Sequence, residues 1–498
     1  MDLNTEGHGM PCGLNRRTLR PTRETAAPHN RLSGRGSTPG AGGFRKEHPA
    51  GVAPFGPSSR PPGRDTAEDV ESQRRHSGAR CHVAFRYRYS GIAGAMRPSP
   101  IRELFKMTQR PGMISFAGGL PDPAIFPVAE FAACASVLRD KGTVALQYGA
   151  SEGYRPLAED IARRMAPLLG RAVAPEEVVI SSGSAQVVDM LARVLLDPGD
   201  VVVVEAPTYP GALHTFRAAG ARFLPVPCDD DGMRVDLLPE AIEACRRETG
   251  RAPRLIYTIV NFSNPSGVCL AASRRRQLAR FAADLGIPVL EDDPYGELRY
   301  RGERIPTLFS QSTGGVVFAS SFSKVLAPGV RVAWAVGDAE LIRKMVIAKQ
   351  GMDLCTSMVA QVLVAEYCQR GFLDAHLEKI KSHYAAKAAA MTAALHEHLP
   401  ADVTFAEPAG GFFFWLRLGR DSRAVFERAV EEGVAFLPGG AFYPEPAETV
   451  GATVDGTPYA RACFTFAGPD EIVEGCRRLA RALAGPPLPE GNRLPGAS

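Results

Sequence analysis

The sequence predicts an α/β protein with a mostly parallel central sheet flanked by helices, followed by a smaller α+β C-terminal domain. Two observations support this prediction. Between about residues 177 and 336, short apolar runs alternate with helical patterns, which is typical of parallel strands joined by helices that cover both faces of the sheet. Beyond residue 357, a long stretch of helical periodicity precedes shorter, separated apolar runs, which indicates a second domain.

The elements are expected in a regular order along the chain. Apolar runs predict buried strands of the large domain at 178–180, 201–204, 255–260, 288–290, 316–319 and 332–336. Helical periodicity predicts helices that end near 196 and that cover about 211–219, 272–285 and 338–351. In the smaller domain, helical periodicity covers 357–398, strands are expected at 412–415, 434–437 and 462–466, and a final helix at about 470–484.

Composition excludes several classes of protein. The chain has 498 residues, of which 45% are hydrophobic and 22% charged, so it can bury a large core. Residues 1–90 contain 15 Lys and Arg against 8 Asp and Glu, and the other residues 43 against 46, so the folded part is slightly acidic and does not suggest a nucleic-acid surface. The ten cysteines show no C-x-x-C spacing, which argues against a zinc site and fits a reducing, cytoplasmic location. No apolar run reaches the length of a membrane-spanning helix.

The first 95 residues differ from the rest of the chain. They are rich in Gly, Pro, Arg and Ser and show almost no apolar periodicity, so we expect a disordered head that cannot bury enough surface to fold. They lack the apolar core of a secretory signal. Translation from Met96 is an alternative explanation of this head.

Lys324 lies in a loop rich in Ser, Pro and Gly that follows the strand expected at 316–319. Burial disfavours the charged form of a lysine and lowers its pKa toward the free amine, which is a nucleophile. Three serines stand just before the lysine and Arg331 follows it, and hydroxyls with a guanidinium can bind phosphate. An amine beside a phosphate site indicates a phosphorylated aldehyde held by the lysine, which is pyridoxal phosphate. The alternative is a surface lysine in a polar loop.

Four further signals fall at the ends of expected strands, in chain order. The turn Ser182-Gly183-Ser184 can bind an anion through the N–H groups at a helix start, and Tyr209 can stack on a flat ring. Asn264 can meet the cofactor's phenolic oxygen, and Asp292 can keep a pyridine nitrogen protonated. Each also has an ordinary interpretation, as an N-cap, a core tyrosine, a β-turn or a solvated acidic turn. Together with Lys324 they favour the cofactor, because all five fall where α/β sheets bind ligands.

On these motifs the chain resembles the pyridoxal-phosphate aminotransferases of PLP-transferase fold type I, and among them the α-aminoadipate and kynurenine aminotransferases, over about residues 97–485. The resemblance implies that Lys324 is the Schiff-base lysine, that Asp292 pairs with the pyridine nitrogen and that Tyr209 stacks on the ring. These three are the implied catalytic residues. The residues implied to bind the cofactor are Ser184, Ala185, Tyr209, Asn264, Asp292, Tyr295, Ser321, Lys324, Arg331 and, across a subunit interface, Tyr148. The branch often has glutamine where this chain has Ala185, whose backbone N–H could still serve.

The resemblance also implies the substrate residues and the domains. Arg461 would grip the α-carboxylate bidentately, Gly119 and Asn264 would line the pocket, and Arg102 would meet a distal carboxylate. The expected divisions are a disordered head at 1–95, an N-terminal arm and substrate-covering segment at 96–145, a large cofactor-binding domain at 146–355, a small domain at 356–485 and a disordered tail at 486–498. Because Tyr148 would reach the neighbouring subunit's phosphate, a homodimer with shared sites is implied.

The implied activity is transfer of an amino group between an L-amino acid, with glutamate as one donor, and a 2-oxo acid by a ping-pong mechanism. Lys324 would take the proton from the substrate Cα and return it to the cofactor. The implied partners are these small molecules, with no metal, nucleic acid or membrane. Two alternatives stay open, namely a decarboxylase, lyase or cyclase on the same scaffold, and an aminotransferase-like transcription regulator. The head lacks any helix-turn-helix pattern, which argues against the regulator.

Overall fold

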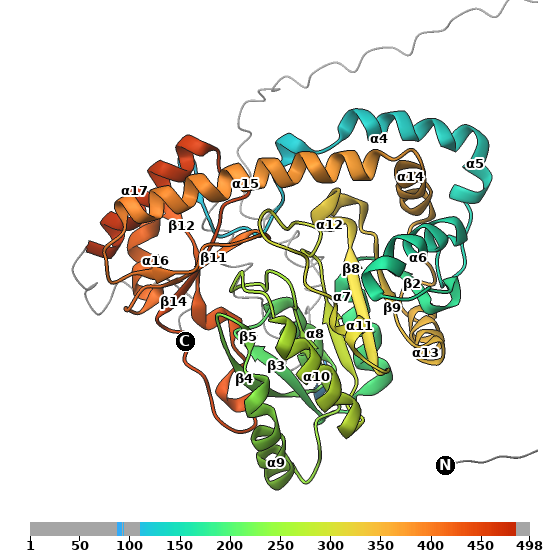
Figure 1. The fold of residues 1–498 in the computed structure, drawn as a ribbon, viewed down its shortest axis with the longest axis horizontal. Helices are drawn as coiled ribbons and strands as arrows, with labels where there is room; N and C mark the ends of the chain where they lie inside the picture. Colours follow the sequence, from blue (N-terminus) through green and yellow to red (C-terminus); the bar gives the residue numbers. More distant parts are fainter. Residues whose placement is uncertain (1–86, 92, 94–109, 485–498) are drawn as a thin grey trace, which may run out of the picture. The chain divides into compact units, whose positions relative to one another are not determined.

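The structure, a computed structural model, describes residues 87–91, 93 and 110–484 (Figure 1). The predictions for residues 1–86, for Arg102 and for residues 486–498 lie outside these residues. Among the helices of the described part, none combines the length and the apolar character needed to cross a bilayer.

The large domain is built on an eight-stranded sheet with the order β2-β9-β8-β7-β6-β3-β4-β5 (Figure 1). Its strands are β2 (Val178–Ser181), β3 (Val201–Ala206), β4 (Arg222–Asp229), β5 (Gly232–Met233), β6 (Leu255–Thr258), β7 (Val289–Asp292), β8 (Val316–Ser321) and β9 (Ala333–Val336). The run from β4 through β3, β6 and β7 to β8 is parallel, whereas β9 is antiparallel to both β8 and β2. These pairings confirm the predicted mostly parallel sheet. Helices join its apolar strands, as is usual for parallel strands.

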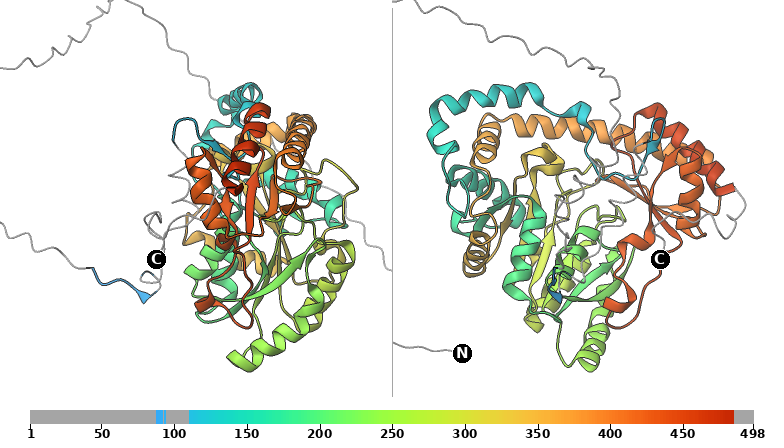
Figure 2. Two further views of the ribbon diagram at one scale, coloured as in Figure 1. Left: turned by 90° about the vertical axis from the view of Figure 1, so that its left-hand side faces the viewer. Right: turned by 180° about the vertical axis from the view of Figure 1, so that it is seen from behind.

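Alternate residues of each strand enter two different cores, one on each face of the sheet. One core contains α7 (Ser184–Leu195), α8 (Pro210–Ala218) and α13 (Ala339–Gln350). The other contains α6 (Arg155–Leu169), α9 (Leu238–Thr249) and α10 (Ala272–Leu285). Figure 2 shows the sheet between these helices from behind. Burial on both faces explains why the strands read as continuous apolar runs.

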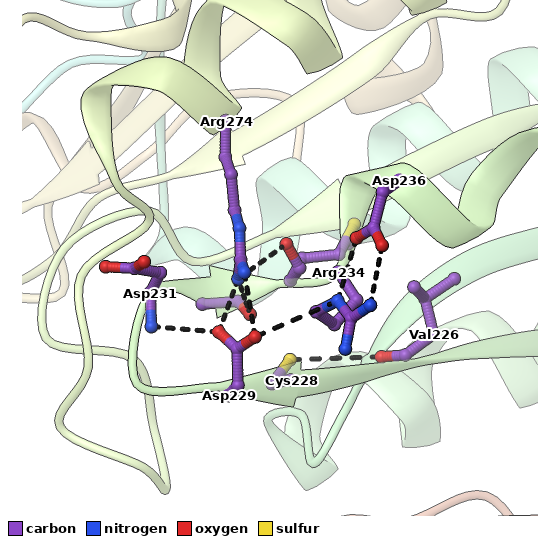
Figure 3. A network of polar contacts seen from close by, with 9 residues as sticks. Val226, Cys228, Asp229, Asp231, Arg234, Asp236 and Arg274 are labelled. Carbon is purple, nitrogen blue, oxygen red and sulfur yellow. Dashed lines mark hydrogen bonds and ion pairs between the residues drawn. The ribbon is translucent and has the colours of Figure 1, made fainter.

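Strand β4 and helices α6 and α9 were not predicted from the sequence. Strand β4 contains Pro225 and Pro227, which cannot donate a ladder hydrogen bond and so weaken the strand signal. An ion-pair network holds this part of the sheet to α10 (Figure 3): Arg274 binds both carboxylate oxygens of Asp229, with Nη2 at 2.7 Å from Oδ2, and Arg234 binds Asp236. These side-chain contacts attach the β4–β5 hairpin from outside the ladder.

The small domain contains a four-stranded antiparallel sheet with the order β10-β11-β14-β13. Its strands are β10 (Thr404–Phe405), β11 (Phe413–Arg417), β13 (Leu437–Pro438) and β14 (Tyr459–Cys463), and its helices include α15 (Phe372–His398), α16 (Ser422–Glu431) and α17 (Pro469–Ala484). Strand β14 corresponds to the strand expected at 462–466, and it begins and ends three residues earlier. The predicted α+β C-terminal part is confirmed.

A strand pairing and a long helix connect distant parts of the described chain. Strand β1 (Ile114–Ser115) pairs in parallel with β12 (Val434–Ala435), so the segment after residue 110 belongs with the small domain. Helix α15 contacts α14 (Met358–Gln369) at one end and α17 at the other, and it spans both domains in Figures 1 and 2. The helical pattern at 357–398 is divided between α14 and α15 at Gly371, which has a φ of +73°. The backbone that follows β1 consequently reaches the carboxyl ends of the large-domain strands.

Candidate active site

Lys324 lies on a short helix, α12 (Phe322–Val325), directly after β8. Its Nζ donates a hydrogen bond to the Gly119 carbonyl oxygen at 2.8 Å and lies 5.6 Å from the centre of the Phe412 ring. Loss of water around the amine lowers the pKa of Lys324 to about 8, and the positive charges of Arg461 and Arg331 act in the same direction. The sequence predicts a loop around Lys324, whereas the structure places it on α12, and this helix holds a lysine that is partly a free amine near neutral pH.

Asp292 ends β7 and has one oxygen without a protein partner. Its Oδ2 accepts a hydrogen bond from the Tyr257 hydroxyl at 2.9 Å, whereas its buried Oδ1 accepts none. Burial raises the pKa of Asp292 to about 7. Both carboxylate oxygens of the neighbouring Asp293 have protein partners. Oδ2 accepts from Asn261 Nδ2 at 3.0 Å and Oδ1 from the Gly296 N–H at 2.8 Å. Asp292 is thus the carboxylate able to accept a further donor.

A cluster of hydroxyls and one guanidinium lies where β8 and the start of α7 approach each other. Ser321 Oγ accepts from the Ser323 N–H at 3.0 Å, and Ser323 Oγ lies 3.4 Å from Arg331 Nη1. Arg331 Nη2 donates to the Ser182 carbonyl at 3.1 Å. Gly183 has a φ of +100°, and a Cβ there would overlap the Arg331 guanidinium. We call these residues, with Ser184 and Ala185 at the start of α7, the phosphate cup.

The α7 end of the phosphate cup presents backbone donors. Helix α7 begins at Ser184, and its N-cap, Gly183, supplies no side-chain hydrogen bond. The first N–H groups of a helix have no partner within the helix and favour an anion. Together with Arg331 they form a site suited to a phosphate group.

Two tyrosines, Tyr209 and Tyr295, lie near Asp292 and Arg461, whose charges act on both hydroxyls. Tyr209 precedes α8, and a Cβ at Gly211 would overlap its ring. Burial raises the pKa of the Tyr209 hydroxyl, Asp292 raises it further, and Arg461 and Arg331 oppose the shift. Tyr295 is buried and packs edge-on against Phe412 and Phe413, and burial also raises its pKa.

Arg461 on β14 is a buried cation held by neutral acceptors. Its Nη1 donates to Asn264 Oδ1 at 2.7 Å and its Nη2 to the Ala117 carbonyl at 2.7 Å, while Nε has no partner. The guanidinium lies 4.3 Å from the centre of the Phe413 ring. A Cβ at Gly119 would stand 3.1 Å from that ring and 3.8 Å from the guanidinium, so the backbone approaches closely there. Burial lowers the pKa of Arg461. Because this buried cation has no carboxylate partner, an anionic ligand would stabilise it.

The structure brings most of the predicted site residues together in one chain, with two exceptions. Tyr148 is 79% exposed and lies on the surface, beside Leu146, which is 81% exposed. Arg102 lies outside the described residues. Reasoning from the sequence missed Tyr257 and the place of the two phenylalanines at 412 and 413 in the site. Tyr257 could have been found from the strand register, since it pairs with Leu290, two residues before Asp292.

These residues fit pyridoxal phosphate. The group carries an aldehyde, a ring nitrogen and a phosphate, and the site offers an amine, a carboxylate oxygen without a partner and the phosphate cup. The aromatic rings of Tyr209 and Tyr295 near Asp292 suit a flat ring.

The comparisons with known proteins agree with this geometry. The family model for aminotransferase class I and II matches residues 119–464. The chain is 44% identical over 400 residues to a 2-aminoadipate transaminase from Thermus thermophilus, with 79% of this chain and 96% of that protein covered. A kynurenine aminotransferase structure from Pyrococcus horikoshii matches with a TM-score of 0.74 at 39% identity, over 80% of this chain and 96% of that one.

A second solved structure carries the cofactor group. It is an α-aminoadipate aminotransferase from Thermus thermophilus in complex with N-(5'-phosphopyridoxyl)-L-leucine, with a TM-score of 0.71 and 41% identity over 80% of this chain and 97% of that one. The predicted fold, cofactor and enzyme class are confirmed. The chain belongs to the class I and II aminotransferases and is a pyridoxal-phosphate-dependent enzyme of that family.

Proposed function

We propose that the enzyme transfers an amino group from an L-amino acid, with glutamate as one donor, to a 2-oxo acid in two half-reactions at one site. The observation that carries this proposal is that Lys324 and Arg461 bind backbone carbonyls of the same short segment, residues 117–119. Lys324 Nζ binds the Gly119 carbonyl and Arg461 Nη2 binds the Ala117 carbonyl. A carboxylate held by Arg461 would place the substrate Cα within reach of the lysine amine.

The free Asp292 Oδ1 and the Arg331 cluster support the proposed cofactor-binding roles, which otherwise follow the resemblance to the family. When bound, pyridoxal phosphate supplies an aldehyde carbon for the amino group and a ring that withdraws electrons from Cα. Asp292 would hold the ring nitrogen protonated through its free Oδ1. Tyr209 would cover one ring face, and Asn264 and Tyr295 would donate to the phenolic oxygen. The phosphate would be held by Ser184, Ala185, Ser321 and Arg331.

Lys324 would act as base at the substrate Cα and then as acid at the aldehyde carbon of the cofactor. A pKa of about 8 leaves part of the amine unprotonated at neutral pH, so it can take the proton from Cα and return it to that carbon, on the other side of the amino nitrogen. Arg461 would exchange the Ala117 carbonyl for the substrate carboxylate, and Asn264 could keep accepting from Arg461 through Oδ1 while its Nδ2 donates to the cofactor. Retention of that carboxylate by Arg461 favours transamination over decarboxylation.

We also propose a homodimer with shared sites. Leu146 and Tyr148 expose large apolar side chains next to each other along the chain, which is unusual unless another surface covers them. In a dimer Tyr148 would reach the partner's phosphate cup.

Glutamate as donor requires a second cation, because Arg461 can bind only one of its two carboxylates. Arg102 is the candidate for this role. The relatives named after 2-aminoadipate and kynurenine suggest that the pocket also accepts longer or aromatic side chains.

The test is a half-reaction with glutamate alone. One 2-oxoglutarate per site should form without an acceptor, and a panel of 2-oxo acids should then return the enzyme to its first form, with parallel lines in double-reciprocal plots. Carbon dioxide release, or elimination without a stoichiometric 2-oxo acid, would instead show a decarboxylase or lyase. DNA binding without turnover would show a regulator.

A further inference from the structure

An ion pair joins the last turn of α13 to the partly exposed side chain of Asp353, in the segment before α14, next to the phosphate cup. Lys349 is fully buried, and its Nζ donates to Asp353 Oδ1 at 2.7 Å. The other carboxylate oxygen, Oδ2, accepts from Ser182 Oγ at 2.8 Å. Burial alone would raise the pKa of Asp353, but hydrogen bonds from Lys349, Gln186 and Ser182 lower it below the ordinary value, so the carboxylate is ionised.

Ser182 is fixed through three of its groups. Its N–H donates to Gln186 Oε1 at 2.7 Å, its hydroxyl donates to Asp353, and its carbonyl accepts from Arg331 Nη2 at 3.1 Å. The next residue, Gly183, leaves no room for a Cβ against the Arg331 guanidinium. A shift of Ser182 would therefore move Arg331 and the start of α7 as well.

Charge explains why a lysine accompanies the carboxylate. An isolated carboxylate behind the phosphate cup would repel a phosphate dianion, although water at the partly exposed Asp353 side chain weakens the repulsion. The Lys349 ammonium, 2.7 Å from Asp353 Oδ1, cancels this field. The pair can thus orient the Ser182 turn without weakening the attraction between Arg331 and an anion.

We propose that Asp353 is a positioning residue for the cofactor phosphate. It acts through Ser182 to fix Arg331 and the N–H groups of Ser184 and Ala185, and Lys349 neutralises its charge. This inference rests on the proposed assignment of the phosphate cup.

The test compares two ligands that differ only in the phosphate. Full-length enzyme, stripped of cofactor, is titrated with pyridoxal phosphate and with pyridoxal, and binding is followed by absorbance. Asp353→Asn should weaken pyridoxal phosphate by about tenfold, and pyridoxal by less than about twofold, because the lost orientation acts on the phosphate alone. Lys349→Met should weaken pyridoxal phosphate more than Asp353→Asn does, since it leaves the carboxylate uncompensated.

Two variants serve as references. Asp338→Asn removes the charge of the N-cap residue at the other end of the same helix, α13, and should leave the preference for the phosphate unchanged. Arg331→Gln should reduce that preference by about a hundredfold. If the Asp353→Asn variant does not fold, the double variant Lys349→Met with Asp353→Asn takes its place, because it removes both charges together. The double variant should show the same loss of preference for pyridoxal phosphate over pyridoxal.

The outcomes separate this inference from the proposed function. Loss of the preference in both Arg331→Gln and Asp353→Asn supports the positioning role. If only Arg331→Gln loses it, or if Asp353→Asn weakens both ligands equally, the positioning role is refuted while the phosphate cup stands. If Arg331→Gln keeps the preference, the phosphate cup is wrongly assigned and the inference falls with it.

Discussion

Lys324 should capture pyridoxal phosphate at a rate that follows the deprotonation of its amine, with a midpoint near pH 8. Loss of water around the amine lowers the pKa of Lys324 from 10.5 to about 8, and Arg461 and Arg331 reinforce the shift. At pH 7 an amine with a pKa of 8 is about 9% unprotonated, whereas one with a pKa of 10.5 is about 0.03% unprotonated. The site therefore makes the free amine about 300 times more abundant at neutral pH.

The assay is stopped-flow absorbance after mixing stripped, full-length enzyme with pyridoxal phosphate between about pH 6 and pH 10. A free lysine amide measured in parallel corrects for the titration of pyridoxal phosphate itself. The corrected rate should rise about tenfold per pH unit below pH 8 and then level off. A rate that keeps rising through pH 10 would show an unperturbed amine and refute the burial argument. Lys324→Ala should bind the ligand without this absorbance change and without turnover.

Three further predictions follow from the contacts described. Asp292→Asn should lower kcat by at least about a hundredfold with a much smaller loss of cofactor affinity, because the carboxylate acts on the transition state; a larger kcat loss in Asp293→Asn would show that the wrong carboxylate was chosen. Lys387→Met removes the ammonium partner of the buried Asp122 carboxylate, which keeps only His383 and the Ala124 N–H, and should cost about 3 kcal/mol in chemical denaturation. Lys381→Met, which breaks the exposed pair with Glu378, should cost less than about 0.5 kcal/mol. Dilution to monomers should lower cofactor affinity in the wild type but not in Tyr148→Phe, and equal losses would argue against a shared site.

The sequence was sufficient to predict which residues end the parallel strands, and therefore much of the site. Asp292 ends β7 and Lys324 follows β8, and adjacent parallel strands bring such residues to one edge of the sheet. It was not sufficient for contacts that depend on packing between distant segments. Arg461 meets Asn264 and Ala117 across separations of 197 and 344 residues, which no local pattern encodes.

Strand β4 was missed for a different reason. Its prolines hide the strand signal, and its place in the sheet is specified by neighbours, including the Arg274–Asp229 pair, rather than by its own propensity. The role of Tyr148 rests on a second subunit, so neither the sequence pattern nor one folded chain tests it.

The order of strands in the large sheet has a consequence for biosynthesis. Strand β2 pairs with β9, which the ribosome makes about 150 residues later, so at about 5–20 residues per second β2 waits roughly 8–30 s for its partner. The binding groups are distributed from Gly119 to Arg461, so the nascent chain cannot capture pyridoxal phosphate until translation is almost complete. During that interval the apolar faces of the early strands are not covered by the completed fold, and the cofactor cannot yet stabilise them. The yield of folded enzyme in cells should therefore respond to chaperone supply more strongly than to vitamin B6 supply.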